Sequence, residues 1–278
     1  MKQTRVTSAD GMTLATYQAG NPQGPAILFI HGFNQAALCW DLQMQDPDLV
    51  KRFRMVAYDL RGHGASDQPD DPARYQSEEA FAADTHAVIT SLGLHRPVLV
   101  GWSYGGRLIG DYVRHYGTGA IAGINYVGAL FNSDPAFSGP GAAYLRDMMR
   151  LDLDREIEAT DRFLRACFFL PPPEAMIRRA RFYNMRVLPR TRRALLTRPD
   201  DDGAVLATLR TPVLITHGTR DQLILPEAAR MAAQIIPGAE LSLYHSIGHM
   251  PFAEDTPRFN RELAAFVDGC AQKPALRI

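Results

Sequence analysis

The sequence lacks several features that mark whole classes of protein. Its 278 residues hold three cysteines, Cys39, Cys167 and Cys270, at wide spacings without any C-x-x-C pair, which fits a reducing cytoplasm. No run of about eighteen apolar residues could span a membrane, and no apolar segment of an export signal follows the charged start. Thirty Lys and Arg balance thirty Asp and Glu, so no overall field attracts nucleic acid or anionic lipid. We therefore expect a cytoplasmic protein that binds neither nucleic acid nor membranes.

Short apolar runs alternate with longer helical patterns through most of the chain, and apolar residues make up 46% of it. This alternation predicts an α/β fold with a mostly parallel central sheet flanked by helices. The expected central strands are Ala26–Ile30, Phe53–Tyr58, Pro97–Val100, Ile121–Val127, Pro212–Thr216 and Glu240–Tyr244. Val6–Ser8 and Met12–Gln18, joined across Asp10-Gly11, are expected to form a leading hairpin.

The alternation stops between residues 134 and 203, where the sequence shows no convincing strand. Loops rich in proline, glycine or aspartate bound this segment, and apolar residues recur inside it at helical spacing. We expect a core made of residues 1–133 and 204–278, with residues 134–203 forming an inserted helical cap.

A Gly101-x-Ser103-x-Gly105 pattern follows one expected strand and precedes a helical pattern. Glycines on both sides of a serine permit a sharp strand-to-helix turn that exposes the hydroxyl. A serine hydroxyl needs a base, and the base needs an orienting acid. Asp221 and His249 each follow a later strand, in the chain order Ser, Asp, His that is typical of this kind of site.

Four segments together resemble the α/β-hydrolases that carry a helical cap. They are Phe29-Ile-His-Gly-Phe33, Tyr58-Asp-Leu-Arg-Gly-His-Gly-Ala-Ser-Asp67, Gly101-Trp-Ser-Tyr-Gly-Gly106, and His217-Gly-Thr-Arg-Asp221 with Gly248-His249. The resemblance implies that Ser103 is the nucleophile, His249 the base and Asp221 the acid. It also implies an oxyanion hole made by the backbone N–H groups of Phe33 and Tyr104. No metal and no organic cofactor is implied.

Two of these assignments have rivals in the sequence. Related enzymes take the acid from the loop before the cap, where Asp134 lies, and His245 competes with His249 as the base. We favour Asp221, because it follows a later strand in the expected order. We favour His249, because a glycine precedes it and Met250-Pro-Phe252 follows it, as in the family.

The substrate pocket is less well defined by the sequence. The candidate lining residues are Asn34, Trp102, Phe131, Phe137 and Phe168. Asn34 either contacts substrate or ties down its loop, and the aromatic residues serve the pocket or the core. The arginines of the cap are interpreted as a solvated helical face. They are Arg178, Arg179, Arg181, Arg186, Arg190, Arg192 and Arg193.

The expected activity is that of a serine hydrolase that cleaves a small to moderate-sized carboxylic ester or lactone through an acyl-enzyme. Fold and catalytic residues alone do not separate this activity from a cofactor-free haloperoxidase or perhydrolase, or from a carbon–carbon bond hydrolase. A ligand-binding receptor with negligible turnover and an acyltransferase also stay open. The expected partner is a small molecule, and the oligomeric state is undecided, with a homo-oligomer included.

Overall fold

One sheet forms the centre of the protein in the computed structural model, which describes residues 1–132, 134–149, 152–199 and 203–272. In the described chain the sheet has eight strands in the order β1-β2-β4-β3-β5-β6-β7-β8. The strands are β1 (Lys2–Thr7), β2 (Thr13–Gly20), β3 (Ala26–Ile30), β4 (Arg54–Tyr58), β5 (Val98–Trp102), β6 (Gly123–Val127), β7 (Val213–Gly218) and β8 (Glu240–Tyr244). β2 pairs antiparallel with β1 and with β4, and all other neighbouring strands are parallel. The predicted α/β fold class is confirmed.

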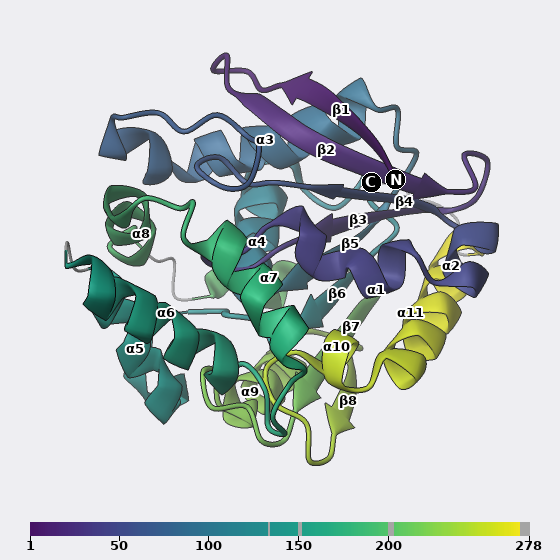
Figure 1. The fold of residues 1–278 in the computed structure, drawn as a ribbon. Helices are drawn as coiled ribbons and strands as arrows, with labels where there is room; N and C mark the ends of the chain where they lie inside the picture. Colours follow the sequence, from purple (N-terminus) through teal and green to yellow (C-terminus); the bar gives the residue numbers. More distant parts are fainter. Residues whose placement is uncertain (133, 150–151, 200–202, 273–278) are drawn as a thin grey trace.

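Helices cover both faces of the sheet (Figure 1). The α-helices are α1 (Asp41–Met44), α2 (Pro47–Arg52), α3 (Glu78–Ser91), α4 (Tyr104–Tyr116), α5 (Ala143–Asp147), α6 (Leu153–Ala166), α7 (Glu174–Asn184), α8 (Pro189–Leu196), α9 (Pro226–Ile235), α10 (Pro251–Glu254) and α11 (Thr256–Ala271). Short 3-10 turns are η1 (Ala37–Trp40), η2 (Pro72–Tyr75), η3 (Pro135–Phe137), η4 (Pro140–Ala142) and η5 (Ala204–Thr208). α3, α4 and α9 pack on one face, and α1, α2 and α11 pack on the other.

The central strands are buried on both faces, as their continuous apolar runs predict. In β3, Leu28 and Ile30 contribute to one apolar core, while Ile27 and Phe29 contribute to the core on the opposite face. This division follows from the strand geometry, in which successive side chains point to opposite sides. A buried parallel sheet of this kind brings the carboxyl ends of its strands to a common edge, where connecting loops can place side chains.

The chain between β6 and β7 forms helices α5 to α8, and its described part contains no strand. In Figure 1 these four helices gather on one side of the molecule, with α7 crossing in front of the sheet. Residues 133 and 200–202, which lie next to the predicted boundaries of the 134–203 segment, fall outside the described residues.

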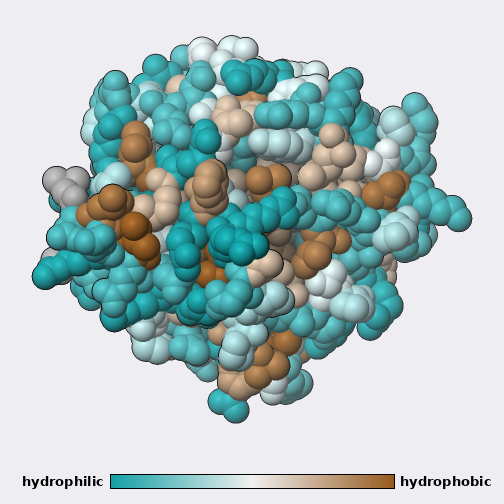
Figure 2. All heavy atoms as spheres, viewed as in Figure 1, coloured by the Kyte–Doolittle hydropathy of each residue, from teal (hydrophilic) through white to brown (hydrophobic). Residues whose placement is uncertain are grey.

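The face seen in Figure 2 is mainly hydrophilic, with hydrophobic residues in separate small patches. Phe182, Leu170 and Leu153 are the most exposed large apolar side chains of the described chain, at 77%, 65% and 61%. In the described part of the chain, no helix combines the length and the apolar character needed to cross a membrane.

Candidate active site

Ser103 lies at the sharp turn between β5 and α4. Its φ of +55° falls in a region that L-residues rarely adopt, and its N–H donates to Val127 O at 2.9 Å. A Cβ at Gly105 would lie 2.6 Å from the Ile30 carbonyl oxygen, and one at Gly101 would lie 2.7 Å from Gly105 O. Only glycine fits at these two positions, so the predicted pattern allows helix α4 to begin directly against the sheet.

A buried carboxylate and an imidazole meet beside this turn. Asp221 follows β7 and His249 follows β8, and His249 Nδ1 lies 2.7 Å from Asp221 Oδ2. The backbone N–H groups of Leu223 and Ile224 donate to Asp221 Oδ1 at 2.8 and 3.0 Å. Both ionisable side chains are almost completely buried. The backbone donors therefore fix the carboxylate, and the carboxylate fixes the imidazole.

The pKa of Asp221 lies well below its ordinary value. Burial acts to raise this pKa, but the charge of His249 and the hydrogen bonds from His217 and His249 outweigh it. Asp221 is therefore a carboxylate across the neutral pH range.

Residues close to Ser103 also contact His249. The Trp102 indole N–H donates to His249 O at 2.9 Å, and the two rings are 5.5 Å apart between centroids. A Cβ at Gly128, directly after β6, would lie 3.2 Å from His249 Nδ1. Two residues later, the Leu130 N–H donates to Ser103 O at 3.0 Å. The structure thus brings Ser103, Asp221 and His249 to one edge of the sheet.

Two backbone N–H groups near Ser103 are free to bind an anion. In the described chain, no residue accepts a hydrogen bond from the N–H of Phe33 or Tyr104. Tyr104 is the first residue of α4, so its N–H is one of the unpaired donors at a helix start. Phe33 follows β3, the strand next to β5 in the sheet.

His31 holds the peptide that carries the Phe33 N–H. His31 Nδ1 lies 2.8 Å from Gly32 O, and His31 Nε2 accepts the Leu60 N–H at 3.0 Å. Since a carbonyl only accepts, Nδ1 carries the proton, and burial lowers the pKa of His31 to about 4. A trans peptide points its C=O and N–H in opposite directions. Fixing Gly32 O therefore fixes the direction of the Phe33 N–H.

His217 is a residue to which the sequence analysis gave no role. Its Nε2 lies 2.9 Å from Ile224 O and 3.2 Å from Asp221 Oδ2, the oxygen that also contacts His249. The Ile224 carbonyl only accepts, so His217 Nε2 carries a proton that also faces Asp221. The sequence signal for this contact was the four-residue spacing in His217-Gly-Thr-Arg-Asp221. A turn of this length can bring the His217 and Asp221 side chains together.

The rival residues lie away from this cluster. Asp134 is exposed, and its carboxylate accepts the N–H of Ala136 at the start of η3. His245 is exposed at the end of β8. The carboxylate and the imidazole that contact each other are therefore those of Asp221 and His249.

The five candidate pocket residues occupy different surroundings. Trp102 is buried beneath His249, and Phe131 packs edge-on against Tyr126 at 5.1 Å between ring centroids. Phe137 packs partly buried against the core on one face of the sheet, whereas Phe168 belongs to the core on the other face. The side chain of Asn34 is fully buried and bonds to cap residues, so it ties its loop to the cap.

Most of the cap arginines are exposed, as expected: Arg178, Arg179, Arg186, Arg190 and Arg193, with Arg181 partly exposed. Arg179, Arg181 and Arg190 pair with the carboxylates of Asp41, Asp161 and Asp70. Arg178, Arg179 and Arg186 line a cavity of about 680 Å³ between α7 and the core. Arg192 is completely buried and pairs with Glu156, so the expectation of a solvated side chain is wrong for it. Its hydrogen-bonding partners lie inside the protein.

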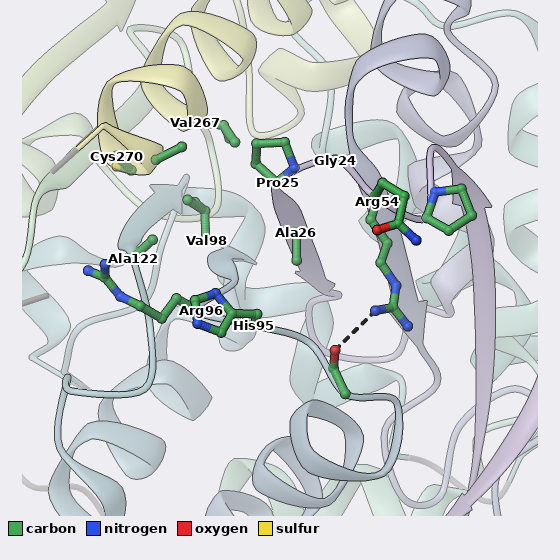
Figure 3. A pocket seen from close by; sticks show the side chains of 14 residues that line it. Gly24, Pro25, Ala26, Arg54, His95, Arg96, Val98, Ala122, Val267 and Cys270 are labelled. Atoms are coloured by element: carbon green, nitrogen blue, oxygen red, sulfur yellow. Dashed lines mark hydrogen bonds between the residues drawn. The ribbon is translucent and has the colours of Figure 1, made fainter. Parts of the chain in front are cut away.

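A separate cavity of about 540 Å³ opens at the opposite edge of the sheet (Figure 3). Ala26 and Val98, which begin β3 and β5, line it together with Arg54, His95 and Arg96. Arg54 donates to the carbonyl oxygen of Gly93 at 3.0 Å. None of the predicted site residues lines this cavity. Across the described residues, no group of three or more His, Cys, Asp or Glu is arranged to hold a metal ion.

The chain is similar to known proteins over most of its length. Residues 27–262 match the model of the alpha/beta hydrolase family. The crystal structure of an aryl esterase candidate from Burkholderia cenocepacia is 35% identical, with a TM-score of 0.93 over 98% of this chain and 100% of that one. Esterase RhEst1 from Rhodococcus sp. ECU1013 is 33% identical, with a TM-score of 0.89 over 96% and 99%. A non-heme chloroperoxidase from Streptomyces lividans is 28% identical over 94% of this chain and 98% of its own.

Proposed function

The chain belongs to the alpha/beta hydrolase family, and we propose that it is a serine hydrolase that cleaves small to moderate-sized carboxylic esters or lactones. The observation that carries this proposal is the 2.7 Å contact between His249 and the buried Asp221, at the edge where Ser103 has a φ of +55°. Two solved structures more than 30% identical to this chain carry esterase names. Esters and lactones share the acyl-transfer chemistry that these three side chains can perform.

The reaction begins with attack of Ser103 Oγ on the ester carbonyl carbon, while His249 Nε2 accepts the hydroxyl proton. The backbone N–H groups of Phe33 and Tyr104 bind the oxyanion of the tetrahedral intermediate, which is worth about a hundred- to a thousandfold in rate per donor. The intermediate collapses as His249 returns the proton to the leaving alcohol. Water then attacks the acyl-enzyme by the same steps, and the acid departs.

Asp221 acts through His249 in this scheme. Its contact with Nδ1 leaves Nε2 as the nitrogen that faces the reacting groups. The pKa of Asp221 is held below its ordinary value, so the acid stays charged and stabilises the imidazolium that forms during each proton transfer.

We assign residues 1–133 and 204–278 to the hydrolase core and residues 134–203 to a helical cap. Helices α7 and α8 supply side chains that contact the loop after β3, so the cap would form one wall of the substrate site. Phe131, Phe137 and Phe168 stay proposed as lining residues.

The test is hydrolysis of p-nitrophenyl esters from acetate to laurate by the wild type, Ser103→Ala and Ser91→Ala. The proposal predicts sustained turnover by the wild type and a loss of about a thousandfold or more in Ser103→Ala. Ser91 is exposed at the end of α3 and serves as the control, with unchanged activity. Equal activity of wild type and Ser103→Ala would refute the mechanism, and at most one turnover per chain would favour a receptor.

A second candidate function is halide oxidation through a peracid, which the 28% identical chloroperoxidase favours. In this route a carboxylic acid first acylates Ser103 and a water molecule leaves, and hydrogen peroxide then replaces water as the group that attacks the acyl-enzyme. The peracid that leaves then oxidises bromide. Bromination that requires both acetate and peroxide, and that is lost in Ser103→Ala, identifies this activity.

A further inference from the structure

The turn that carries the Phe33 N–H depends on Asn34. Phe33 and Asn34 are the two central residues of a tight turn, closed by a 3.3 Å hydrogen bond from the Gln35 N–H to Gly32 O. Asn34 has a φ of +61°, which asparagine tolerates better than most residues. Its side chain is fully buried, so its polar atoms must find partners inside the protein.

Both polar atoms of the Asn34 side chain bond to the cap. Arg192 Nε, from α8, donates to Asn34 Oδ1 at 2.9 Å. Asn34 Nδ2 in turn donates to Asn184 Oδ1, from the end of α7, at 2.7 Å. The cap therefore holds the turn through hydrogen bonds to both the oxygen and the nitrogen of the Asn34 side-chain amide.

Arg192 is itself fixed by the other cap helices. Its Nη1 donates to Glu156 Oε1 of α6 at 2.5 Å and to Met148 O at 2.6 Å. Its Nη2 donates to Asn184 O at 2.9 Å. The guanidinium is fully buried, so the charge of Glu156 compensates for the loss of water around it. The planar guanidinium has five N–H donors in a fixed arrangement, so it can bind these acceptors together, whereas the ammonium group of lysine lacks this geometry.

Helix α6 contacts the same turn at a second point. The Phe163 ring meets the Phe33 ring edge-on, with 6.5 Å between centroids and 88° between planes. Both central residues of the turn thus contact the cap, Phe33 through α6 and Asn34 through α7 and α8.

We propose that Arg192, held by Glu156, is a positioning residue that fixes the Phe33 N–H toward the reacting carbonyl through Asn34. The docked cap then completes the oxyanion hole as well as covering the substrate. This proposal rests on the proposed serine hydrolase activity. Loosening the link weakens transition-state binding more than substrate binding, because the oxyanion exists only in the transition state.

The test compares Asn34→Gly with Asn34→Asp. Glycine adopts the same positive φ without strain but removes both hydrogen bonds, whereas aspartate keeps the acceptor for Arg192. Arg192→Lys removes the planar guanidinium, and Arg181→Lys is the matched control, because Arg181 pairs with Asp161 in the cap instead of with the turn. The readouts are kcat and KM for a p-nitrophenyl ester and the rate at which a fluorophosphonate labels Ser103. Labelling displaces fluoride from phosphorus and places the phosphoryl oxygen in the oxyanion hole.

Asn34→Gly and Arg192→Lys should lose about tenfold or more in kcat and in labelling rate, with KM changed less than about twofold. Asn34→Asp should stay within about threefold of the wild type, and Arg181→Lys should match it. Wild-type labelling rates in folded Asn34→Gly would overturn this inference alone. A wild type that is not labelled at Ser103 would overturn the proposed function, and the inference with it.

Discussion

At the residue scale, we expect His217 to support catalysis through its contact with Asp221. His217 Nε2 faces the Asp221 oxygen that contacts His249, at 3.2 Å. His217→Gln keeps a donor at the end of the side chain, and His217→Leu removes it. A hydrogen bond to a charged group contributes about 1.5–3 kcal/mol, so we expect His217→Leu to lose at least about tenfold in kcat/KM. His217→Gln should recover most of the rate. Equal kcat/KM for the two variants would show that the hydrogen bond from His217 does not contribute to catalysis.

Two other buried histidines make stability depend on pH. Burial lowers the pKa of His31 to about 4, and burial together with the neighbouring His31 lowers that of His63 to about 3. Both groups titrate near 6.5 in the unfolded chain, so between pH 6.5 and 4 the unfolded state binds more protons. The free energy of unfolding therefore falls as the pH falls through this window, by about 1.4 kcal/mol per pH unit for each histidine.

Urea denaturation at a series of pH values measures this slope. His63 Nδ1 donates to Arg61 O at 2.9 Å, and His63→Asn keeps a donor there while removing the titrating ring. The slope of the variant should be smaller than that of the wild type by about 1.4 kcal/mol per pH unit. Identical slopes would show that His63 is already protonated in the folded protein.

Residues with a motif were predictable from the sequence, and residues without one were not. Ser103, Asp221 and His249 each lie in a short pattern that predicts a turn after a strand, and the structure shows contact between Asp221 and His249. The role of Arg192 depends on α6, α7 and α8 packing around one guanidinium. No local pattern distinguishes it from its solvated neighbour Arg193, because burial is a property of the assembled cap.

Helix α4 requires glycine at some positions and merely tolerates it at others. A Cβ at Gly105 would meet the carbonyl oxygens of Ile30 and His31 at 2.6 and 3.1 Å, and backbone cannot yield there. We expect Gly105→Ala to destabilise the fold by about 1–3 kcal/mol and to reduce activity, since α4 carries Tyr104. Gly110 is the matched control in the same helix, because its nearest atoms would be 3.4 Å or more away. Thermal unfolding should show Gly110→Ala to be as stable as the wild type, or more so by up to about 1 kcal/mol.

Elements with strong local signals were predicted to within a few residues. β3 and β8 have the predicted bounds, and β5 runs on to Trp102 because the sharp turn begins only at Ser103. In the cap, apolar residues at helical spacing continue beyond the ends of the helices. Phe168 lies beyond the end of α6 and Val187 beyond the end of α7, because apolar residues in the connecting loops also pack inward.

At the scale of the whole molecule, positive and negative charges are balanced. The formal net charge is zero, and several cap arginines pair with carboxylates. Long-range attraction of a charged substrate is therefore expected to be weak. Raising NaCl from about 20 to 500 mM should change kcat/KM for neutral and acidic esters less than about twofold. A steep loss for the acidic ester alone would show that Arg178 and its neighbours attract substrate.

The most direct test of the account is to trap the acyl-enzyme. Wild-type protein mixed with p-nitrophenyl acetate is quenched in acid before the steady state, digested and analysed by mass spectrometry, with Ser103→Ala treated in parallel. We predict one acetyl group per active chain, on Ser103, and none at the corresponding peptide of the variant. Continued ester turnover without acetylated Ser103, or with the acetyl group on another residue, would contradict the assignment of Ser103 as the nucleophile.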